Sequence, residues 1–582
     1  MTVSGGELLL DLLEACGVEY IFCSPGTEWT AVWEGLLKRQ GQAKTTLKYI
    51  NCRHETLAIS MAMGYAEVSG RLPAVLLHAS VGAINGALAI RTAYAARVPM
   101  ILFSGETYEH RGDHEVRAQG WHWLGLLSDI GGPPALVKDY VKWSNSVKSR
   151  DSLVDSVSRG CQIAMTAPRG PVFLSIPTEM LPKSQEGVKI ARPYPAATPV
   201  EPRRKDLEEV AGQLIRSRQP IIITEHPGKQ PGAARKLTEL AELLSIPVFE
   251  SRLPYSSGFP KNNPLYMGQD TSEALRQADT VFVVGGLTPW YPPSAGPGDN
   301  ARIIMLDEDP RHERLPFWGY RADLSISADI EPTLAALADI VRADIAKRKQ
   351  TAPLFPERLE YWREKHEKMM EQSEREALAG RGNRPIATRW FCHVARKSLP
   401  ANAIILDETL THTRFVHQYL AEPGCYIKSA YGGLGVGMGE AAGVKLAHPD
   451  RPVVLMVGDG AFNYNPVLAG LGLYQEYRLP VFVIILDNGG YGAMKFGYQI
   501  MYPEGWAARQ KTYLGVDIAP APDYVKVAEA FGAYGEKLQE PGDIEAALKR
   551  GLEQIAQGKA ALLDVIMENI PPIIPTPRPA GS

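Results

Sequence analysis

The chain has 582 residues, of which 45% are hydrophobic and 22% are charged, and its formal net charge is -3 at pH 7. This composition is that of an ordinary globular protein, and the length predicts about three or four domains rather than one core. The nearly balanced charge gives no reason to expect nucleic acid or a membrane surface as a partner.

The N-terminal third alternates predicted helices and strands. Apolar residues at helical spacing predict a helix over 5–16, and further helices are expected from about Glu28, from the Arg53-His54-Glu55 segment through Ala66, and over 83–96. Short apolar runs predict strands over 20–23, 47–50, 74–77 and 100–104. This alternation is typical of a doubly wound α/β domain, which we place at residues 1–184.

The remainder predicts two more α/β units. A Pro-rich stretch over 184–202 is typical of a linker. A central domain over 203–345 is expected to contain strands at 220–224, 248–250, 280–284 and 302–306. A charged helix over 357–376 then leads to a third domain over 385–568, and a Pro-rich tail, residues 569–582, ends the chain.

Two polar clusters in the third domain follow apolar strands. The run Val453 to Val457 stops at Gly458-Asp459-Gly460, a helix opens near Ala461, and a second run stops at Asp487-Asn488-Gly489-Gly490. In parallel α/β sheets, ligands bind beyond such strand ends. Carboxylate and amide oxygens suit Mg²⁺, and the glycines and the helix start suit a diphosphate. The sequence therefore predicts a magnesium-bridged diphosphate, although each cluster alone is also typical of a turn.

The GDG cluster, followed across a helix and a strand by an Asn-containing turn, resembles the thiamine-diphosphate family that includes benzoylformate decarboxylase, pyruvate decarboxylase and acetolactate synthase. The resemblance implies that Asp459, the Asn488 side chain and the Gly490 carbonyl bind the metal, with Gly458, Gly460 and Ala461 at the diphosphate. The family's paired asparagines are replaced by Asp487-Asn488, which spares the expected ligand. The three units then correspond to pyrimidine-binding, central and diphosphate-binding domains.

The segment Arg53-His54-Glu55, followed by MAMGYA, is similar to the family's activating-glutamate helix. The resemblance implies that Glu55 hydrogen-bonds the aminopyrimidine ring and so promotes loss of the thiazolium C2 proton. The alternative is a glutamate placed at a helix N-terminus for its favourable interaction with the helix dipole.

Two further segments resemble cofactor contacts of the family. In Tyr431-Gly432-Gly433-Leu434-Gly435, the resemblance implies that the Gly432 carbonyl accepts the amino group and that Leu434 supports the bend between the cofactor rings. Thr411 and His412 fall where relatives contact the diphosphate. The alternatives are a Gly-rich turn before a helix and a surface loop.

The substrate pocket is where relatives differ. His78 in LLHASVGAIN occupies the place of an active-site histidine of benzoylformate decarboxylase, and imidazole suits proton transfer near neutral pH. A hydrogen-bonded structural histidine is the alternative. Gln119 resembles a glutamine of acetolactate synthase. The second active-site histidine of benzoylformate decarboxylase has no counterpart in the matching segment GGLTPWYPPS, which contains Trp290 instead. The other expected pocket residues are Thr27, Glu28, Trp29 and Trp290.

The six cysteines are scattered, with no CxxC pair, which argues against a zinc site or a disulfide framework and favours a reducing compartment. We find neither an N-terminal leader nor an apolar run of roughly 20 residues, the length of a membrane span. We therefore expect a cytoplasmic protein.

The resemblance implies a decarboxylase or carboligase that acts on a 2-oxo acid through a C2 carbanion and an enamine, with thiamine diphosphate and Mg²⁺. Acetolactate-synthase-like transfer and a 2-hydroxyacyl-CoA lyase are the alternatives, followed by a non-catalytic relative. We expect no FAD, because its central-domain motifs are not found. Small 2-oxo acids, aldehydes or ketones are the expected substrates. The family's shared site implies at least a homodimer, and a homotetramer is expected.

Overall fold

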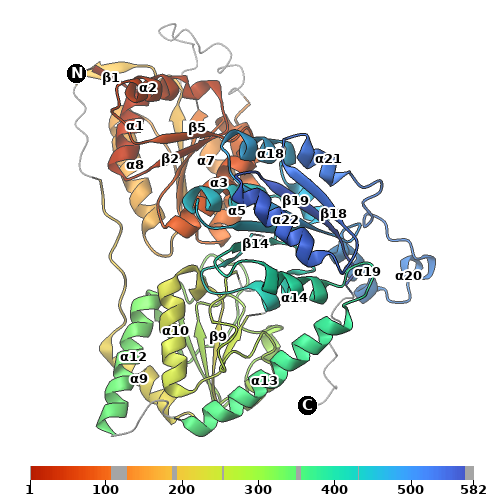
Figure 1. Cartoon of the computed structure of the whole chain (residues 1–582). Helices are drawn as coiled ribbons and strands as arrows, with labels where there is room; N and C mark the ends of the chain where they lie inside the picture. The colour runs from red at the N-terminus through yellow and green to blue at the C-terminus, as the bar shows by residue number, and fades with distance from the viewer. Residues whose placement is uncertain are drawn as a thin grey trace.

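The computed structural model describes residues 2–106, 128–186, 193–251, 255–348, 355–429 and 432–570. Within them, three parallel sheets of six, five and six strands follow one another along the chain, each covered by helices (Figure 1). The predicted architecture of three consecutive doubly wound α/β domains is thereby confirmed.

The first domain contains a six-stranded sheet in the order β3-β2-β4-β5-β7-β6. Its strands are β2 (Tyr20–Cys23), β3 (Lys48–Asn51), β4 (Ala74–Leu77), β5 (Met100–Glu106), β6 (Trp143–Ser146) and β7 (Pro171–Pro177). Its helices are α1 (Gly5–Ala15), the 3-10 turn η1 (Thr27–Trp29), α2 (Thr30–Gly41), α3 (Glu55–Ser69), α4 (Ala79–Asn85), α5 (Ala87–Ala95), α7 (Pro133–Val137), η2 (Lys138–Tyr140) and α8 (Arg150–Met165).

Two segments of this domain differ from the prediction. The helix expected over 83–96 is two helices, and the first of them, α4, begins directly after His78. Residues 184–186, expected in the linker, form β8 (Ser184–Glu186), which pairs antiparallel with β1 (Thr2–Ser4). A three-residue pairing between the two ends of a domain depends on backbone hydrogen bonds and leaves almost no hydrophobic pattern.

The central domain has a five-stranded sheet in the order β10-β9-β11-β12-β13. Four of its strands were predicted, whereas the edge strand β13 was not, because its LSIS segment lacks an apolar run and is mostly exposed. The elements are α9 (Arg204–Arg216), β9 (Pro220–Thr224), η3 (Pro227–Lys229), α10 (Pro231–Leu244), β10 (Val248–Glu250), α11 (Ser272–Gln277), β11 (Thr280–Val284), η4 (Pro293–Ala295), β12 (Arg302–Asp307), β13 (Leu324–Ser327) and α12 (Ile330–Lys347).

The third domain has its six strands in the order β15-β14-β16-β17-β19-β18. The sheets of the first and third domains therefore share one topology. Its strands are β14 (Ile404–Glu408), β15 (Tyr426–Lys428), β16 (Val453–Gly458), β17 (Val481–Asp487), β18 (Tyr534–Leu538) and β19 (Ala561–Ile566). Helix α13 (Pro356–Ala379) packs against the central domain and leads to the third one. The helices of the third domain are α14 (Thr388–Ser398), α15 (Thr413–Leu420), α16 (Gly437–Ala447), α17 (Asp459–Tyr464), α18 (Val467–Glu476), α19 (Gly492–Met501), α20 (Trp506–Gln510), α21 (Tyr524–Glu529) and α22 (Ile544–Ala556).

Helices α3 and α16 join the first and third domains within the chain. Their backbones lie so close that a Cβ on Gly64 would collide with the Glu440 carbonyl oxygen, and one on Gly443 would collide with the Met61 carbonyl oxygen. One buried hydrophobic cluster runs through both domains across this contact. The two sheets therefore share a core and hold a fixed relative position.

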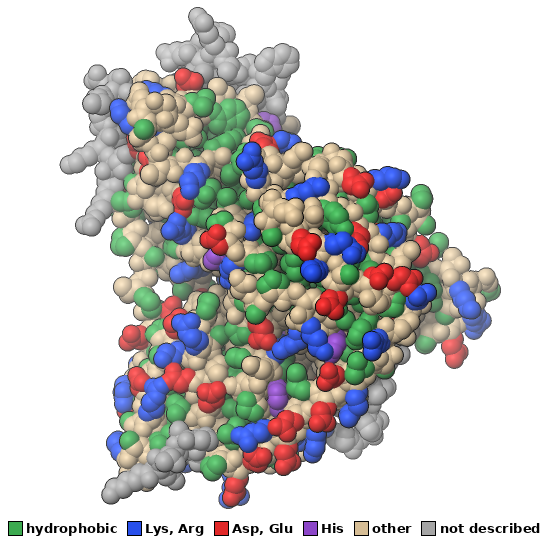
Figure 2. All heavy atoms as spheres, viewed as in Figure 1, with side chains coloured by type: hydrophobic (Ala, Val, Ile, Leu, Met, Phe, Trp, Pro, Cys, Tyr) green, Lys and Arg blue, Asp and Glu red, His purple; other side chains and the backbone are tan. Residues whose placement is uncertain are grey.

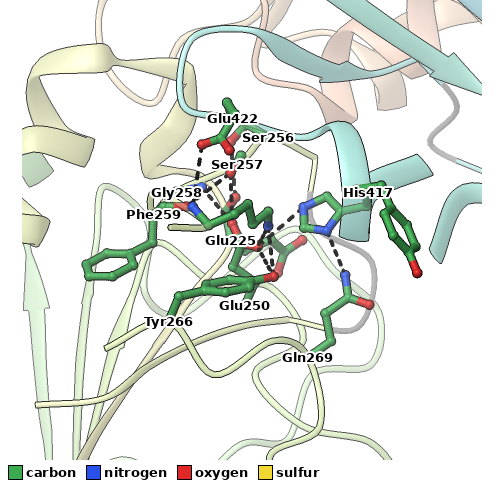
Figure 3. A network of polar contacts seen from close by, with 12 residues as sticks. Glu225, Glu250, Ser256, Ser257, Gly258, Phe259, Tyr266, Gln269, His417 and Glu422 are labelled. Carbon is green, nitrogen blue, oxygen red and sulfur yellow. Dashed lines mark hydrogen bonds and ion pairs between the residues drawn. The ribbon is translucent and has the colours of Figure 1, made fainter. Parts of the chain in front are cut away.

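A buried polar network joins the central and third domains (Figure 3). Glu250, at the end of β10, and Lys261 form an ion pair in which both side chains are almost fully buried. His417 on α15 places its Nε2 3.4 Å from a Glu250 oxygen, and its Nδ1 accepts from the Gln269 amide at 3.1 Å. Burial holds the pKa of His417 well below its usual range, so the ring is neutral. The network thus fixes α15 against the central domain.

Acidic and basic side chains are interspersed over the described part of the face shown in Figure 2. Among the helices that the structure describes, none combines the length and the apolar composition that crossing a membrane requires.

Candidate active site

The two predicted polar clusters lie at one edge of the third sheet. Strands β16 and β17 are adjacent and parallel, with Gly458 paired to Leu486 at their carboxyl ends. Asp459 opens α17 directly after β16, and Asn488 follows β17. Parallel strands in register therefore bring the aspartate and the asparagine to the same crevice.

Oxygen atoms of three residues can converge in this crevice. One terminal atom of the Asn488 amide lies 3.2 Å from Asp459 Oδ1 and 2.8 Å from the Gly490 carbonyl oxygen. With its nitrogen on that side, the amide donates to both; with its oxygen there, three oxygens meet around a point that a cation can occupy. The Asp459 carboxylate is 2% exposed, and its Oδ2 has no hydrogen-bond partner among the described residues.

These residues fit Mg²⁺, which takes oxygen ligands and keeps several waters. Burial, followed by the neighbouring Asp487 carboxylate, raises the pKa of Asp459 to about 7, and a bound cation would favour the ionised form instead. Within the described residues, no group of three His, Cys, Asp or Glu side chains suits a metal. The candidate set here uses a single carboxylate, completed by an amide and a backbone carbonyl.

Backbone pairing fixes the turn that carries Asn488. The Tyr491 N–H donates to the Val516 carbonyl at 2.8 Å, and the Ile518 N–H donates to the Gly489 carbonyl at 3.1 Å. A Cβ on Gly460 would lie 2.7 Å from the Tyr491 ring. Glycine is therefore required at 460 for the start of α17 to lie this close to the turn.

Thr411 and His412 lie between β14 and α15. A Cβ on Gly492 would lie 3.2 Å from the Asn488 side chain and 3.3 Å from that of Thr411, so these two side chains flank the start of α19. His412 is 1% exposed, and its Nδ1 lies 3.0 Å from the Thr388 hydroxyl. Burial lowers the pKa of His412 to about 3, so the ring is neutral.

Glu408 is a site residue that the sequence reasoning missed. Its fully buried carboxylate accepts hydrogen bonds from the N–H groups of Gly435 at 2.7 Å and Val436 at 3.0 Å, and from the Asn465 amide at 2.8 Å. Burial raises its pKa. Glu408 thereby holds the loop of Gly432, at φ +82°, and Leu434, which packs against the shared core. An acid that ends a buried strand was the only sequence signal.

Glu55 lies in the first domain, at the first residue of α3. The preceding His54 caps the helix, because its side chain accepts from the Thr56 N–H at 3.2 Å. The Asn85 amide donates to one Glu55 oxygen at 2.6 Å, and a Cβ on Gly82 would lie 3.4 Å from the other. The half-buried carboxylate is thus positioned by α4.

His78 and Glu28 form a pair beside Glu55. The His78 Nδ1 lies 2.9 and 2.8 Å from the two Glu28 oxygens, and the Ala79 N–H donates to Glu28 at 2.8 Å. The Glu28 side chain is fully buried, whereas that of His78 is 40% exposed. The hydrogen bond to Glu28 is the main reason that the pKa of His78 is raised.

The other predicted pocket residues occupy different surroundings. Thr27 is exposed in η1. Trp29 is fully buried, and its indole donates to the Leu77 carbonyl at 3.1 Å. Trp290 is buried in the central domain against Tyr320. Both indoles pack in hydrophobic clusters of this chain, and the pocket role predicted for them stays a prediction. Gln119 lies outside the described residues.

Comparison with protein-family models matches all three domains. The models describe the N-terminal TPP binding domain, the central domain and the C-terminal TPP binding domain of thiamine pyrophosphate enzymes, over residues 3–121, 207–337 and 410–565. The chain belongs to the thiamine pyrophosphate enzyme family. The predicted resemblance is confirmed, and the matched TPP binding domains support thiamine diphosphate as the cofactor.

Relatives with assigned activities match nearly end to end. Benzoylformate decarboxylase of Pseudomonas aeruginosa is 29% identical over 90% of this chain and 93% of its own length. The acetolactate synthase large subunit of Haemophilus influenzae is 23% identical over 98% and 96%. The solved 4-hydroxybenzoylformate decarboxylase of Rhodococcus jostii RHA1 has a TM-score of 0.77 at 24% identity, over 98% of this chain and 100% of that one, and supports the fold.

These matches assign the chain to a branch of the family. It is a thiamine-diphosphate-dependent enzyme of the decarboxylase and acetolactate synthase branch. Glu55 lies in the region matched by the N-terminal TPP binding model, and Asp459 and Asn488 lie in the region matched by the C-terminal one.

Proposed function

We propose that the protein is a decarboxylase or carboligase that acts on a 2-oxo acid and uses thiamine diphosphate and Mg²⁺. The observation that carries the proposal is the convergence of Asp459, Asn488 and Gly490 at adjacent strand ends, in the domain that matches TPP binding. Similarity to a benzoylformate decarboxylase favours an acid with an apolar substituent, since that relative's name specifies such a substrate.

In this proposal, different residues of the third domain bind the metal ion, the diphosphate and the organic part of the cofactor. Asp459, Asn488 and the Gly490 carbonyl hold Mg²⁺. The diphosphate lies at the N-terminus of α17, against the backbone of Gly458, Gly460 and Ala461, with Thr411 and the neutral His412 beside it. Gly432 and Leu434, held by Glu408, contact the organic part of the cofactor. When bound, the cofactor supplies an electron sink that lets CO₂ leave the substrate.

Glu55 contributes the acid–base function of the first domain. A carboxylate that is fixed by the Asn85 amide can accept or return a proton on the cofactor's pyrimidine ring without reorienting. His78, at the N-terminus of α4, is the candidate acid or base toward substrate.

We propose that two copies of the chain complete each site. Exposed apolar side chains lie on helices of both halves. Val81 and Ile84 are on α4, the helix that contacts Glu55, and Tyr464 and Leu468 are on α17, which begins at Asp459, and on the following α18. Apolar patches of this kind mark protein interfaces. At least a homodimer follows, and a homotetramer forms if two dimers associate.

A buried carboxylate in the central domain supports the expectation that this domain binds neither FAD nor the nucleotide of CoA. Glu225, at the end of β9, accepts from the backbone N–H groups of Leu287 at 2.8 Å and Thr288 at 3.3 Å. These amides lie at the carboxyl ends of the central strands, where a doubly wound sheet binds nucleotide phosphates. Because Glu225 already occupies them, an acidic ligand there would meet a competing acidic group.

The test is CO₂ release from a panel of aliphatic and aromatic 2-oxo acids with thiamine diphosphate and Mg²⁺. We expect rapid release by the wild type and a loss of roughly 100-fold or more in Glu55→Gln, the usual contribution of a general acid or base. An aldehyde product indicates a decarboxylase, and a 2-hydroxy ketone indicates acetolactate-synthase-like transfer. If no acid releases CO₂, the proposal is wrong and cleavage of preformed 2-hydroxy compounds becomes the better hypothesis.

A further inference from the structure

Glu28 is a fully buried carboxylate, and its hydrogen bonds among the described residues go to the segment that carries His78. Both carboxylate oxygens face the His78 Nδ1, and one of them also accepts the Ala79 N–H. The side chain itself is fully buried, so the carboxylate reaches substrate only through the imidazole. The pocket role predicted for Glu28 stays a prediction.

The surrounding backbone is built to permit the Glu28–His78 pair. A Cβ on Gly26 would collide with the Glu28 carboxylate and would lie 2.5 Å from the His78 Nδ1, so only glycine leaves room at this position. Trp29, next to Glu28, hydrogen-bonds the carbonyl of Leu77, which precedes His78. Two consecutive residues of η1 therefore fix the segment that carries the imidazole.

The backbone just after His78 is strained. Ala79 has φ +40°, a conformation that residues with a Cβ rarely adopt, and its N–H is the group that Glu28 binds. Such strain persists where the surrounding structure enforces it, and it is concentrated at functional sites. The hydrogen bond from Ala79 to Glu28 is a direct means of enforcing it here.

We propose that Glu28 is a positioning residue that acts through His78. It holds a proton on the His78 Nδ1, so that the opposite nitrogen, Nε2, is the atom that exchanges protons with the reacting molecule. The inference rests on the proposed decarboxylation, in which a 2-oxo acid and one proton give an aldehyde and CO₂. His78 Nε2 donates that proton to the carbon that has lost CO₂, and the imidazole regains a proton from water.

Among the described residues, three carboxylates favour the protonated form of His78. Glu28 on η1, Glu55 on α3 and Asp129, before α7, each raise the pKa of His78, and burial opposes them without reversing the result. Since the protonated ring is the donor, activity is present below this pKa and declines as the pH rises through it. Removing the Glu28 charge must move that decline to lower pH.

The decisive variant is Glu28→Gln, which keeps the size of the side chain but removes its charge and can turn an amide N–H toward Nδ1. We expect the alkaline limb of kcat/KM for CO₂ release to move down by about one pH unit, with a roughly tenfold loss above the wild-type midpoint and little loss well below the shifted one. Glu34→Gln, an exposed glutamate on α2, is the matched control and leaves the limb in place. An unshifted limb in Glu28→Gln overturns the inference.

A second readout does not depend on turnover. In protein with ¹³C-labelled histidine, the His78 resonance is assigned by its loss in His78→Gln, and its titration is followed by NMR. The midpoint is expected to fall in Glu28→Gln and to stay close to that of the wild type in Glu28→Asp, which keeps the charge. If no 2-oxo acid is decarboxylated but the midpoint falls, the proposed function fails and the pair stands; an unchanged midpoint refutes the pair itself.

Discussion

At Asp459, burial and the Asp487 carboxylate raise the pKa to about 7, which is an unfavourable setting for a lone carboxylate near neutral pH. With the oxygen of its amide turned to this side, Asn488 adds a second oxygen there, and the Gly490 carbonyl adds a third. The proposed Mg²⁺ would offset the cost of bringing these groups together, which supports the metal assignment proposed above.

The Asp459→Asn variant tests that conclusion. We expect the affinity for thiamine diphosphate in the presence of Mg²⁺ to fall by roughly 100-fold, because a metal-binding carboxylate contributes at least as much as the groups that orient it. Isothermal titration calorimetry measures the change. Asp517→Asn, an exposed aspartate whose backbone pairs with Gly490, is the control and retains wild-type affinity. Equal affinities for the two variants would contradict the assignment.

The positions of candidate residues could be predicted where one short segment contains the whole motif, whereas their roles stay predictions. Asp459, Asn488 and Glu55 stand in such segments, and each lies at the end of the element predicted for it. Glu408 could not be predicted, because its partners at 435 and 436 are joined to it only by the fold. The role of Glu28 likewise depends on a contact with His78 that no local spacing reveals.

Helices α3 and α16 are elements whose packing depends on the absence of side chains. In an exposed helix, replacing glycine by alanine adds about 0.5–1 kcal/mol of stability. We expect the opposite for Gly64→Ala, a loss of about 1–3 kcal/mol in the free energy of unfolding, since the new Cβ collides with the Glu440 backbone. Urea denaturation measures it. Gly41→Ala, where nothing lies within 4 Å, is the control, and a stable Gly64→Ala protein would refute the close packing.

The element α15 depends on the charge network in Figure 3. Lys261→Met leaves Glu250 buried without its ammonium partner, and we expect a loss of about 3–5 kcal/mol in the free energy of unfolding. The comparison is Lys236→Met, which breaks a more exposed pair with Glu239 and should cost about 1 kcal/mol or less. Denaturation of both variants in urea distinguishes them, and similar losses would show that the buried pair contributes nothing particular.

Elements followed from sequence where a buried face leaves a pattern. Strands β9, β11, β16 and β17 are covered on both sides, so each is a continuous apolar run. Edge strand β13 is short and partly exposed, and the β1–β8 pair consists of three residues on each side held mainly by backbone hydrogen bonds. Neither has a comparable apolar run in the sequence. The break between α4 and α5 at Gly86 was missed because both helices keep apolar spacing.

On the scale of the whole molecule, the chain contains two sheets of identical topology joined through a shared core, with a third sheet beside them (Figure 1). Glu55 belongs to the first domain and the proposed metal ligands to the third. Within the chain, the described contact between these domains is made mainly along α3 and α16, and apolar side chains on α4, α17 and α18 stay exposed. This distribution is the reason that we assign each complete site to two copies.

Subunit complementation tests this claim most directly. Glu55→Gln and Asp459→Asn are purified separately, shown to be inactive in CO₂ release, then mixed, dissociated and reassociated. A hybrid dimer contains one site built from two unaltered halves, so random mixing restores about a quarter of wild-type activity if each site is shared between copies. If each site lies within one chain, every site carries a defect, and mixing restores no activity. Hybrids that form but release no CO₂ would contradict the account.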